Sequence, residues 1–369
     1  MNTELPPPGE LCLSQDSQAV RTLENLLLIS LRLRICNVRP RERDPSPLSE
    51  PNIAILFSGG LDCTMLARLS HELLPLSESI DLLNVAFENP RIHTDPTVNP
   101  YELCPDRITA RRSHQELQNA CPGRAFRLLL INVPYAETLA HRPTITALMY
   151  PHDTEMDLSI ATALYFAARG LGTLEASTSP RSSSAAQAPS TARAPHRTAA
   201  RVLLSGLGAD ELFGGYHRHG AAFAQRGHAA LVAELALDVG RLGRRNLGRD
   251  DRVLAHWARE PRYPFLDEDL VAWALRVPAG LKAGFGLGAR PGVDGAPDPL
   301  AEPGKRVLRA LALRCGMPGV AGERKRAIQF GARTAKMESG RVKGTGKIDG
   351  GAGPAGGSAS EARHGDPGA

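Results

Sequence analysis

The stretch ILFSGGLDCTMLARL, residues 55–69, joins a short apolar run to a segment with the apolar spacing of a helix. Ser58, Gly59 and Gly60 occupy the turn, and Asp62 follows at the start of the expected helix. Glycines let the backbone bend tightly and approach an anion, while free N–H groups and the dipole at a helix start favour negative charge. The turn therefore predicts a phosphate site, although an ordinary strand–helix turn with Ser58 or Asp62 as the cap would use the same residues.

The surrounding sequence predicts a parallel sheet. Four apolar runs are continuous, as in strands buried on both faces, at residues 53–57, 80–87, 126–133 and 201–206. Helix-like stretches lie between them at residues 62–74, 106–120 and 153–170. This order favours an α/β fold with helices covering the sheet, and the loops that follow parallel strands share the edge where such sheets bind ligands. We expect Ser58 and Gly206 at that edge.

Domain organisation follows from composition. We expect flexible segments at residues 1–17, which contain three consecutive prolines, and at the Ser-, Ala-, Gly- or Pro-rich residues 173–200, 283–304 and 339–369. Residues 18–338 form the folded domain, with 173–200 and 283–304 as insertions in it. A helix is expected over residues 19–38, and the C-terminal part is expected to be mostly helical.

The overall composition excludes several classes of protein. The net charge of +5 is mild, so we expect no nucleic-acid partner. The six cysteines form no CxxC pair, which argues against a zinc or thioredoxin-type site and favours a reducing compartment. The sequence has neither an apolar run of about eighteen residues nor a signal peptide. We therefore expect a soluble, cytoplasmic protein without a membrane partner.

A second loop repeats the pattern of the first. In VLLSGLGADELFGGY, residues 202–216, a strand leads into Ser205–Gly208 and then into Asp210 and Glu211 at a helix start. Helix capping alone would explain the two carboxylates. However, Asp62 and Asp210 at one sheet edge would be able to hold Mg²⁺ on a pyrophosphate group from opposite sides. The chain has no GxxxxGK[ST] motif, which excludes a P-loop NTPase site.

These loops carry a resemblance to a known family. FSGGLDCTMLA resembles the SGGxDS signature of the PP-loop ATP pyrophosphatases, with Cys63 in place of the signature serine, and the second loop resembles the SGxGADExFGGY segment of asparagine synthetases. Further segments resemble that family in order, at residues 105–117, 157–170, 246–253, 262–271 and 325–338. The resemblance implies an adenine nucleotide alpha hydrolase-like (PP-loop) fold.

The resemblance also implies a reaction that uses ATP and Mg²⁺. The side-chain carboxylate of aspartate attacks the α-phosphorus, pyrophosphate leaves, and ammonia displaces AMP to give asparagine. By motif position, the resemblance implies that ATP and pyrophosphate are bound by Ser58, Gly59, Gly60, Asp62, Cys63, Val85 and Phe87. It implies that the substrate is bound by Ser205, Gly206, Gly208, Asp157 and Ser159, and that the metal is bound by Asp62 and Asp210. The implied catalytic residues are these two aspartates and Lys305, which neutralises the departing phosphates.

Simpler explanations remain for some of these residues. Core packing would account for Val85 and Phe87, helix capping for Asp157 and Ser159, and a solvated position at a helix start for Lys305.

Two departures from the family weaken the enzymatic interpretation. Leu207 replaces the acidic residue of the SGEG form, so amidation would lack a base. The chain starts with Met1 and Asn2, without a cysteine in second position, and only about fifty residues precede the first strand, so we expect direct use of ammonia, a separate glutaminase-like partner or a shortened product. The alternatives are a nucleotide-binding pseudoenzyme with an interaction or regulatory role, or adenylation of another carboxylate or a nucleic-acid base.

The remaining polar clusters are expected on the surface. His217 and His219 are two residues apart and would not share a helix face, so they are not expected to bind a metal. The charges of RLGRRNLGRDDR, residues 241–252, are expected to be solvated or to form a partner surface.

Overall fold

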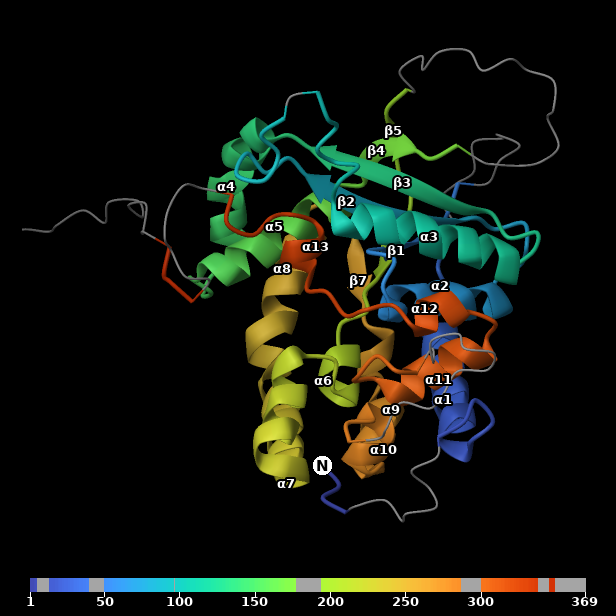
Figure 1. Cartoon of the computed structure of the whole chain (residues 1–369). Coiled ribbons are helices and arrows are strands. Elements are labelled where there is room, and N and C mark those ends of the chain that lie inside the picture. Colours follow the sequence, from blue (N-terminus) through green and yellow to red (C-terminus); the bar gives the residue numbers. More distant parts are fainter. Residues whose placement is uncertain are drawn as a thin grey trace, which may run out of the picture.

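The computed structural model describes residues 1–4, 13–39, 50–95, 97–176, 194–286, 300–337 and 345–348. Its centre is a seven-stranded sheet with the order β5-β4-β3-β2-β1-β6-β7 (Figure 1). The strands are β1 (Ile53–Leu56), β2 (Ile80–Phe87), β3 (Phe126–Val133), β4 (Leu171–Leu174), β5 (His196–Arg197), β6 (Val202–Leu204) and β7 (Glu260–Arg262). All neighbours are parallel except β3–β4 and β4–β5, so the expected α/β fold with a mostly parallel sheet is confirmed.

Strand β1 is central, and this position decides where the first glycine loop lies. Ile55 pairs with Leu82 of β2 on one side and with Leu204 of β6 on the other. Strand β2 is buried at all its positions, as its mostly apolar run predicts, and its polar residues Asp81 and Asn84 are buried as well. Because β1 and β6 are parallel neighbours, the loops that follow them leave the sheet side by side.

Helices cover both faces of the sheet. They are α1 (Gln18–Ile35), α2 (Leu61–Leu73), α3 (Pro105–Ala120), α4 (Tyr135–Met149), α5 (Glu155–Arg169), α6 (Ala209–Phe213), α7 (His217–Leu242), η1 (Gly243–Leu247), α8 (Gly248–Ala255), η2 (Pro264–Leu266), α9 (Glu268–Arg276), α10 (Ala279–Ala283), α11 (Arg306–Arg314), α12 (Pro318–Ala321) and α13 (Ile328–Gly331). Alternate strand residues feed two cores: α1, α2, α3 and α11 pack on one face, and α4, α5 and α8 pack on the other.

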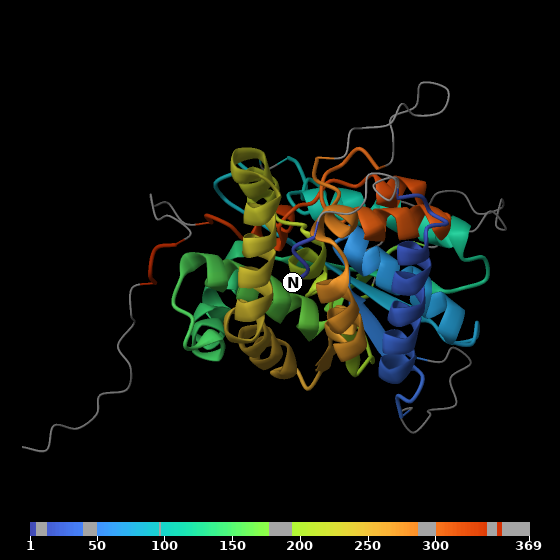
Figure 2. The same ribbon diagram turned by 90° about the horizontal axis from the view of Figure 1, so that it is seen from below.

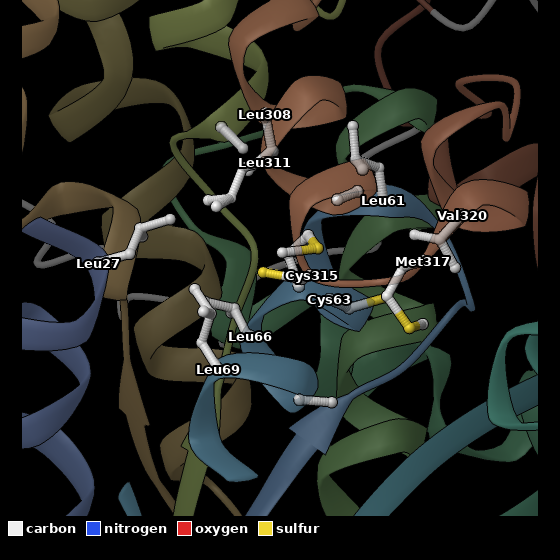
Figure 3. Packing of buried hydrophobic residues seen from close by; sticks show 14 of the residues in the cluster. Leu27, Leu61, Cys63, Leu66, Leu69, Leu308, Leu311, Cys315, Met317 and Val320 are labelled. Carbon is white, nitrogen blue, oxygen red and sulfur yellow. The ribbon is translucent and has the colours of Figure 1, made fainter. Parts of the chain in front are cut away.

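The first core joins the N-terminal helices to the C-terminal ones. Figure 3 shows Leu61, Cys63 and Leu66 of α2 near Leu308 and Leu311 of α11, all within one buried cluster. Figure 2 shows α9 between α1 and α7, as Figure 1 does from the side. From α6 onward the described elements are helices apart from the short strand β7, so the expectation that the C-terminal part is mostly helical is confirmed.

Some elements differ from expectation. Helix α4 was not predicted, because it contains Pro143 and buries only Thr138, Ile145 and Met149, which leaves little apolar periodicity to detect. Strands β4 and β5 lie at the two ends of the expected 173–200 insertion, since Leu130 of β3 pairs with Thr173. Residues 177–193 of that insertion lie outside the described residues, as do 5–12, 40–49, 96, 287–299, 338–344 and 349–369.

Four residues of the expected tail are described, and they contact the start of α5. Glu155 N donates to Gly346 O at 3.0 Å, and Ile348 N donates to Asp153 O at 2.8 Å. Across the described ranges, no helix is both long enough and apolar enough to cross a membrane.

Candidate active site

The loop between β1 and α2 is bent tightly against α3. Gly59 has φ +79°, and a Cβ there would lie 2.4 Å from Ala110 N, so only glycine fits. Its carbonyl oxygen accepts a hydrogen bond from Ser113 Oγ at 2.6 Å. Gly60 N donates to Ser58 Oγ at 3.3 Å. Gly59 thus allows the turn to pack against α3, while Ser58 and Gly60 line a cavity.

The loop between β6 and α6 lies against the first one. A Cβ on Gly206 would lie 3.0 Å from Asp62 Cβ, so the two loops are in contact. Ser205 N donates to Arg262 O at 3.0 Å, and Leu207 N donates to Ser205 Oγ at 3.3 Å. Gly208 has φ +103°, which turns the chain into α6. The neighbouring positions of β1 and β6 therefore bring Asp62 and Asp210 to one place.

A lysine bridges the two aspartates. Lys305 Nζ lies 2.8 and 2.6 Å from the two carboxylate oxygens of Asp62 and 2.6 Å from Asp210 Oδ1. Its side chain is only 3% exposed, so it is not a solvated residue at a helix start. The backbone of Lys305 is left-handed, with φ +55°, and its N–H donates to Phe213 O at 2.9 Å. This uncommon conformation for a lysine turns the start of α11 toward the two loops.

A second lysine completes the cluster. Lys325 Nζ donates to Asp210 Oδ2 at 2.5 Å. Burial alone would raise the pKa of the Asp210 carboxyl, but the ammonium groups of Lys305 and Lys325 outweigh burial and hold this pKa well below its usual range. Gly215 is required beside the cluster, since a Cβ there would lie 1.9 Å from Asp210 Oδ1. The cluster therefore pairs two aspartates with two lysines.

The cluster forms one wall of a cavity of about 260 Å³. Both loops, Lys305 and the segment 323–329 line it, together with an apolar wall made by Leu56, Leu83, Val85, Ile160, Leu164 and Ala332. A site with an apolar wall and a few charged groups suits a small molecule that has a flat apolar part and an ionic part.

The structure does not bring all the predicted residues to the cavity. Ser58, Gly60, Asp62, Cys63, Val85, Ser205, Gly206, Asp210 and Lys305 line it, whereas Gly59, Phe87, Asp157, Ser159 and Gly208 do not. Phe87 packs edge-to-face on Phe166, with ring centroids 5.7 Å apart. Ser159 Oγ donates to Met156 O at 2.8 Å, and Asp157 N donates to the cap residue Thr154.

Cys63 is placed where its thiol can contact both the loop and the cavity. Its Sγ donates to Gly60 O at 3.3 Å and lies 3.7 Å from Ser58 Oγ. Burial raises the pKa of the thiol, so it is neutral near pH 7. A neutral thiol donates a weaker hydrogen bond than a hydroxyl group would.

Several site residues were not predicted. Lys325 sits between two arginines, and nothing in its local pattern distinguishes it from them. Asp106, at the start of α3, lines the cavity 3.7 Å from Arg326 Nη1. Burial raises the pKa of Asp106 to about 7, although the charges of Arg326 and Lys325 oppose this shift. Its position after Pro105 at a helix start suggests only a cap in the sequence.

Two expectations about surface charges are wrong. Arg249 and Asp250 were expected to be solvated, but both are buried and both line the cavity. His219 is fully buried, with Nε2 2.8 Å from Asp238 Oδ2, while His217 is exposed as expected. Arg249 has a partner distant in the chain, Asp157, and His219 has a partner 19 residues away, Asp238, neither of which local spacing reveals.

The aspartate pair fits a divalent cation that arrives with a nucleotide. Among the residues described, no three His, Cys, Asp or Glu side chains form a metal-binding group. Mg²⁺ in nucleotide sites needs only one or two carboxylates, because phosphates and water supply the other ligands. Asp210 Oδ1 is buried and accepts no hydrogen bond within the described part, even though Lys305 Nζ lies 2.6 Å away as an ion pair. This oxygen retains capacity for a cation.

Comparison with known proteins identifies the family of this chain. Residues 175–231 and 224–344 match the profile of the Asparagine synthase family. The chain is 38% identical over 329 residues to an asparagine synthetase domain-containing protein of Saccharomyces cerevisiae, covering 87% of this chain and 54% of the relative. It is 36% identical over 356 residues to asparagine synthetase domain-containing protein 1 of Mus musculus, covering 87% of this chain and 53% of the relative.

A shorter similarity extends to an archaeal protein. The putative glutamine-hydrolyzing asparagine synthetase 1 of Methanocaldococcus jannaschii is 36% identical over 154 residues, covering 37% of this chain and 28% of the relative. The chain spans about half the length of the eukaryotic relatives that it matches. The chain therefore belongs to the asparagine synthase family, which is part of the PP-loop superfamily.

Proposed function

We propose that this chain is an asparagine synthetase-type, ATP-dependent ligase that adenylates the side-chain carboxylate of aspartate, releases pyrophosphate and then forms the amide. The observation that carries the proposal is the meeting of Asp62, Asp210 and Lys305 at one cavity, from three separate segments of the chain. Carboxylates and a triphosphate are all negatively charged, so they can share a site only where cations neutralise the carboxylates and the phosphates. The two lysines supply such positive charges.

ATP would bind across the edge of the sheet. The apolar wall that includes Leu83, Val85 and Ile160 suits the adenine ring. The start of α2, with Ser58 and Gly60 before it, suits the β- and γ-phosphates, because backbone N–H groups and the helix dipole both favour anions there. Asp62 and Asp210 would hold Mg²⁺, which would neutralise phosphate charge.

The chain's own residues would then act by position and charge. A carboxylate oxygen of aspartate attacks the α-phosphorus, and the bond between this phosphorus and the bridging oxygen breaks, with pyrophosphate leaving with the electron pair. Lys305 and Lys325 would stabilise the negative charge that grows on the leaving group. In the structure they neutralise the two aspartates instead, which keeps the buried carboxylates compensated before the nucleotide binds.

The proposal includes a setting as well as a reaction. The substrates are ATP, aspartate and ammonia, with ammonia taken directly or supplied by a separate glutaminase-like protein. A reducing cytoplasmic location is supported by Cys36, Cys63, Cys104, Cys121 and Cys315, which are all free thiols within the described part of the chain.

One assay tests the proposal. The wild-type protein is incubated with ATP, Mg²⁺ and labelled pyrophosphate, with and without aspartate, and the label in ATP is measured. We expect exchange that requires aspartate and that is lost in Asp62→Ala. Exchange that other carboxylates support equally well would instead assign adenylation of a different acceptor.

A second candidate function is that of a nucleotide-binding pseudoenzyme with an interaction or regulatory role. Leu207 favours it, because this apolar side chain lines the cavity where active synthetases are expected to carry a carboxylate. The same assay distinguishes the two functions: ATP binding without any exchange supports the pseudoenzyme.

A further inference from the structure

The cavity contains several carboxylates, and most of them already have partners. Glu211 follows the second loop directly, and both of its carboxylate oxygens already accept hydrogen bonds. Its Oε1 accepts from Tyr216 Oη at 2.6 Å and from Asn246 Nδ2 at 3.2 Å, and its Oε2 accepts from Gly208 N at 3.2 Å. Glu211 therefore holds the second loop and the start of helix α7 in place, and these contacts use three of its roughly four acceptor positions.

The other carboxylates near the nucleotide end are paired with cations. Asp62 and Asp210 contact the two lysines described above. Asp106 lies beside Arg326, and Glu323 is 3.4 Å from Arg112 Nη2. Removing any of these carboxylates from its cation would leave a buried or half-buried charge uncompensated.

Asp250 is also paired with a cation, Arg249, but it lies on a different element, helix α8. It is 6% exposed, it projects from α8 into the cavity, and its Oδ1 accepts a hydrogen bond from Arg249 Nε at 2.8 Å. None of the described residues donates a hydrogen bond to Oδ2 of Asp250. Arg249 is shared, since its Nη1 also donates to Asp157 Oδ1 at 2.6 Å. A single guanidinium group thus serves two carboxylates, and one oxygen of Asp250 remains available.

Asp250 lines the same cavity as Leu207. Asn246 and Arg249, which lie close to it in the chain, also line this cavity. One hydrogen bond ties η1, which directly precedes α8, to the second loop: Asn246 Nδ2 donates to Glu211 Oε1 at 3.2 Å.

The charged and titratable groups around Asp250 come from three elements. Arg249 lies on α8 itself, Asp157 on α5, and Tyr263 directly after β7. Burial raises the pKa of Asp250, Arg249 opposes the shift, and the charge of Asp157 adds to it. A base is most effective when its pKa approaches the working pH, so this direction favours proton transfer.

We propose, on the basis of the function above, that Asp250 is the proton acceptor of the amide-forming step and takes over the role that Leu207 cannot perform. The ammonia lone pair attacks the β-carbonyl carbon of β-aspartyl-AMP and forms the C–N bond. One proton of the new ammonium group passes to Asp250 Oδ2. The tetrahedral intermediate collapses, the bond from carbon to the phosphate oxygen breaks, and AMP leaves with that electron pair. Asp250 then returns its proton to solvent.

The test separates the two half-reactions in the full chain. We compare wild type, Asp250→Asn and the matched control Asp251→Asn, which alters an exposed neighbour on the same helix. Aspartate-dependent pyrophosphate exchange should stay within about 3-fold of wild type in all three proteins, because adenylation needs no base at this position. Asparagine formation from ammonium salts should fall about 100-fold or more in Asp250→Asn alone.

A rescue variant distinguishes a chemical role of Asp250 from a purely structural one. Leu207→Glu combined with Asp250→Asn places a carboxylate at another position that lines the same cavity, and we expect it to regain at least about 10-fold in asparagine formation. Asp250→Glu, which keeps the charge beside Arg249, should retain amidation with a shifted pH–rate profile. Thermal melting of each variant verifies folding.

The outcomes are distinct. Wild-type amidation rates in Asp250→Asn would overturn this inference and leave the proposed function intact. Loss of exchange in a folded Asp250→Asn protein would also overturn it, because Asp250 would then serve adenylation or aspartate binding. Absence of aspartate-dependent exchange in the wild type would overturn the proposed function and this inference together.

Discussion

Replacement of Lys305 by methionine would test the charge cluster on which the site depends. Methionine keeps the length and apolar stem of the side chain but removes the ammonium group that contacts Asp62 and Asp210. The lysine side chain is 3% exposed, and the carboxylates are 19% and 14% exposed. Removing one partner of a buried ion pair costs about 3–5 kcal/mol. Because Asp210 keeps Lys325 and the cavity admits water, we expect a loss near ~3 kcal/mol.

A double-mutant cycle isolates the interaction from the loss of packing. Urea unfolding is measured for wild type, Asp62→Asn, Lys305→Met and the double variant. With both opposite charges removed, the double variant should regain stability relative to Lys305→Met, and the coupling should be about 2 kcal/mol. Lys347→Met removes an 82% exposed lysine from its ion pair with Asp153, and it should leave the unfolding free energy unchanged.

The same variants give a functional readout. Pyrophosphate exchange should fall about 10²–10³-fold in Lys305→Met, the usual cost of losing one preorganised charge partner, and it should not recover in the double variant. The double variant would thus recover stability relative to Lys305→Met without recovering pyrophosphate exchange. Coupling below about 0.5 kcal/mol, together with unchanged exchange, would refute the assignment of Lys305 to a shared ion cluster.

Further variants test the loops and the buried acid. Cys63→Ser restores a hydroxyl donor in the cavity and should lower the KM for ATP about 2- to 10-fold in the exchange assay; a raised KM would show that the thiol is not in the phosphate site. Gly215→Ala places a Cβ 1.9 Å from Asp210 Oδ1 and should reduce exchange about 100-fold, whereas Gly240→Ala, with no atom within 4 Å of its Cβ, should raise stability by ~0.5–1 kcal/mol in urea unfolding. Asp106 has a pKa raised from 3.8 to about 7 by burial, so the folded state keeps a proton that the unfolded state has lost, and wild-type stability should fall as pH rises through this window. Asp106→Asn should remove that slope, worth up to ~4 kcal/mol, and equal slopes for both proteins between pH 5 and 8 would contradict it.

Much of the fold was accessible from local pattern. Largely apolar runs identified β1, β2, β3 and β6 within one or two residues, because a strand buried on both faces is apolar at most of its positions. The short strand β7 was missed, since its three residues include a proline and have no such run. Strand β4 was missed because its sequence continues into a Ser- and Ala-rich segment.

The residues of the site divide in a similar way. Ser58, Gly60 and Asp62 were identified because a glycine turn before a helix imposes a local backbone geometry that residue type alone reveals. Lys325 and Asp250 were not, because a lysine or an aspartate in a charged segment looks the same whether it meets solvent or a buried partner. Their roles appear only once the cavity exists.

By itself, therefore, the sequence determined the backbone elements and the turns of this protein, since conformational preference and apolar periodicity act over a few residues. Only the tertiary structure decided the partners: β1 and β6 became neighbours, Lys305 came to lie between Asp62 and Asp210, and Asp250 was left with one oxygen unpaired. The physical reason is desolvation. A charged side chain that is removed from water needs an opposite charge nearby, and the order of the strands determines which charged residues are buried next to one another.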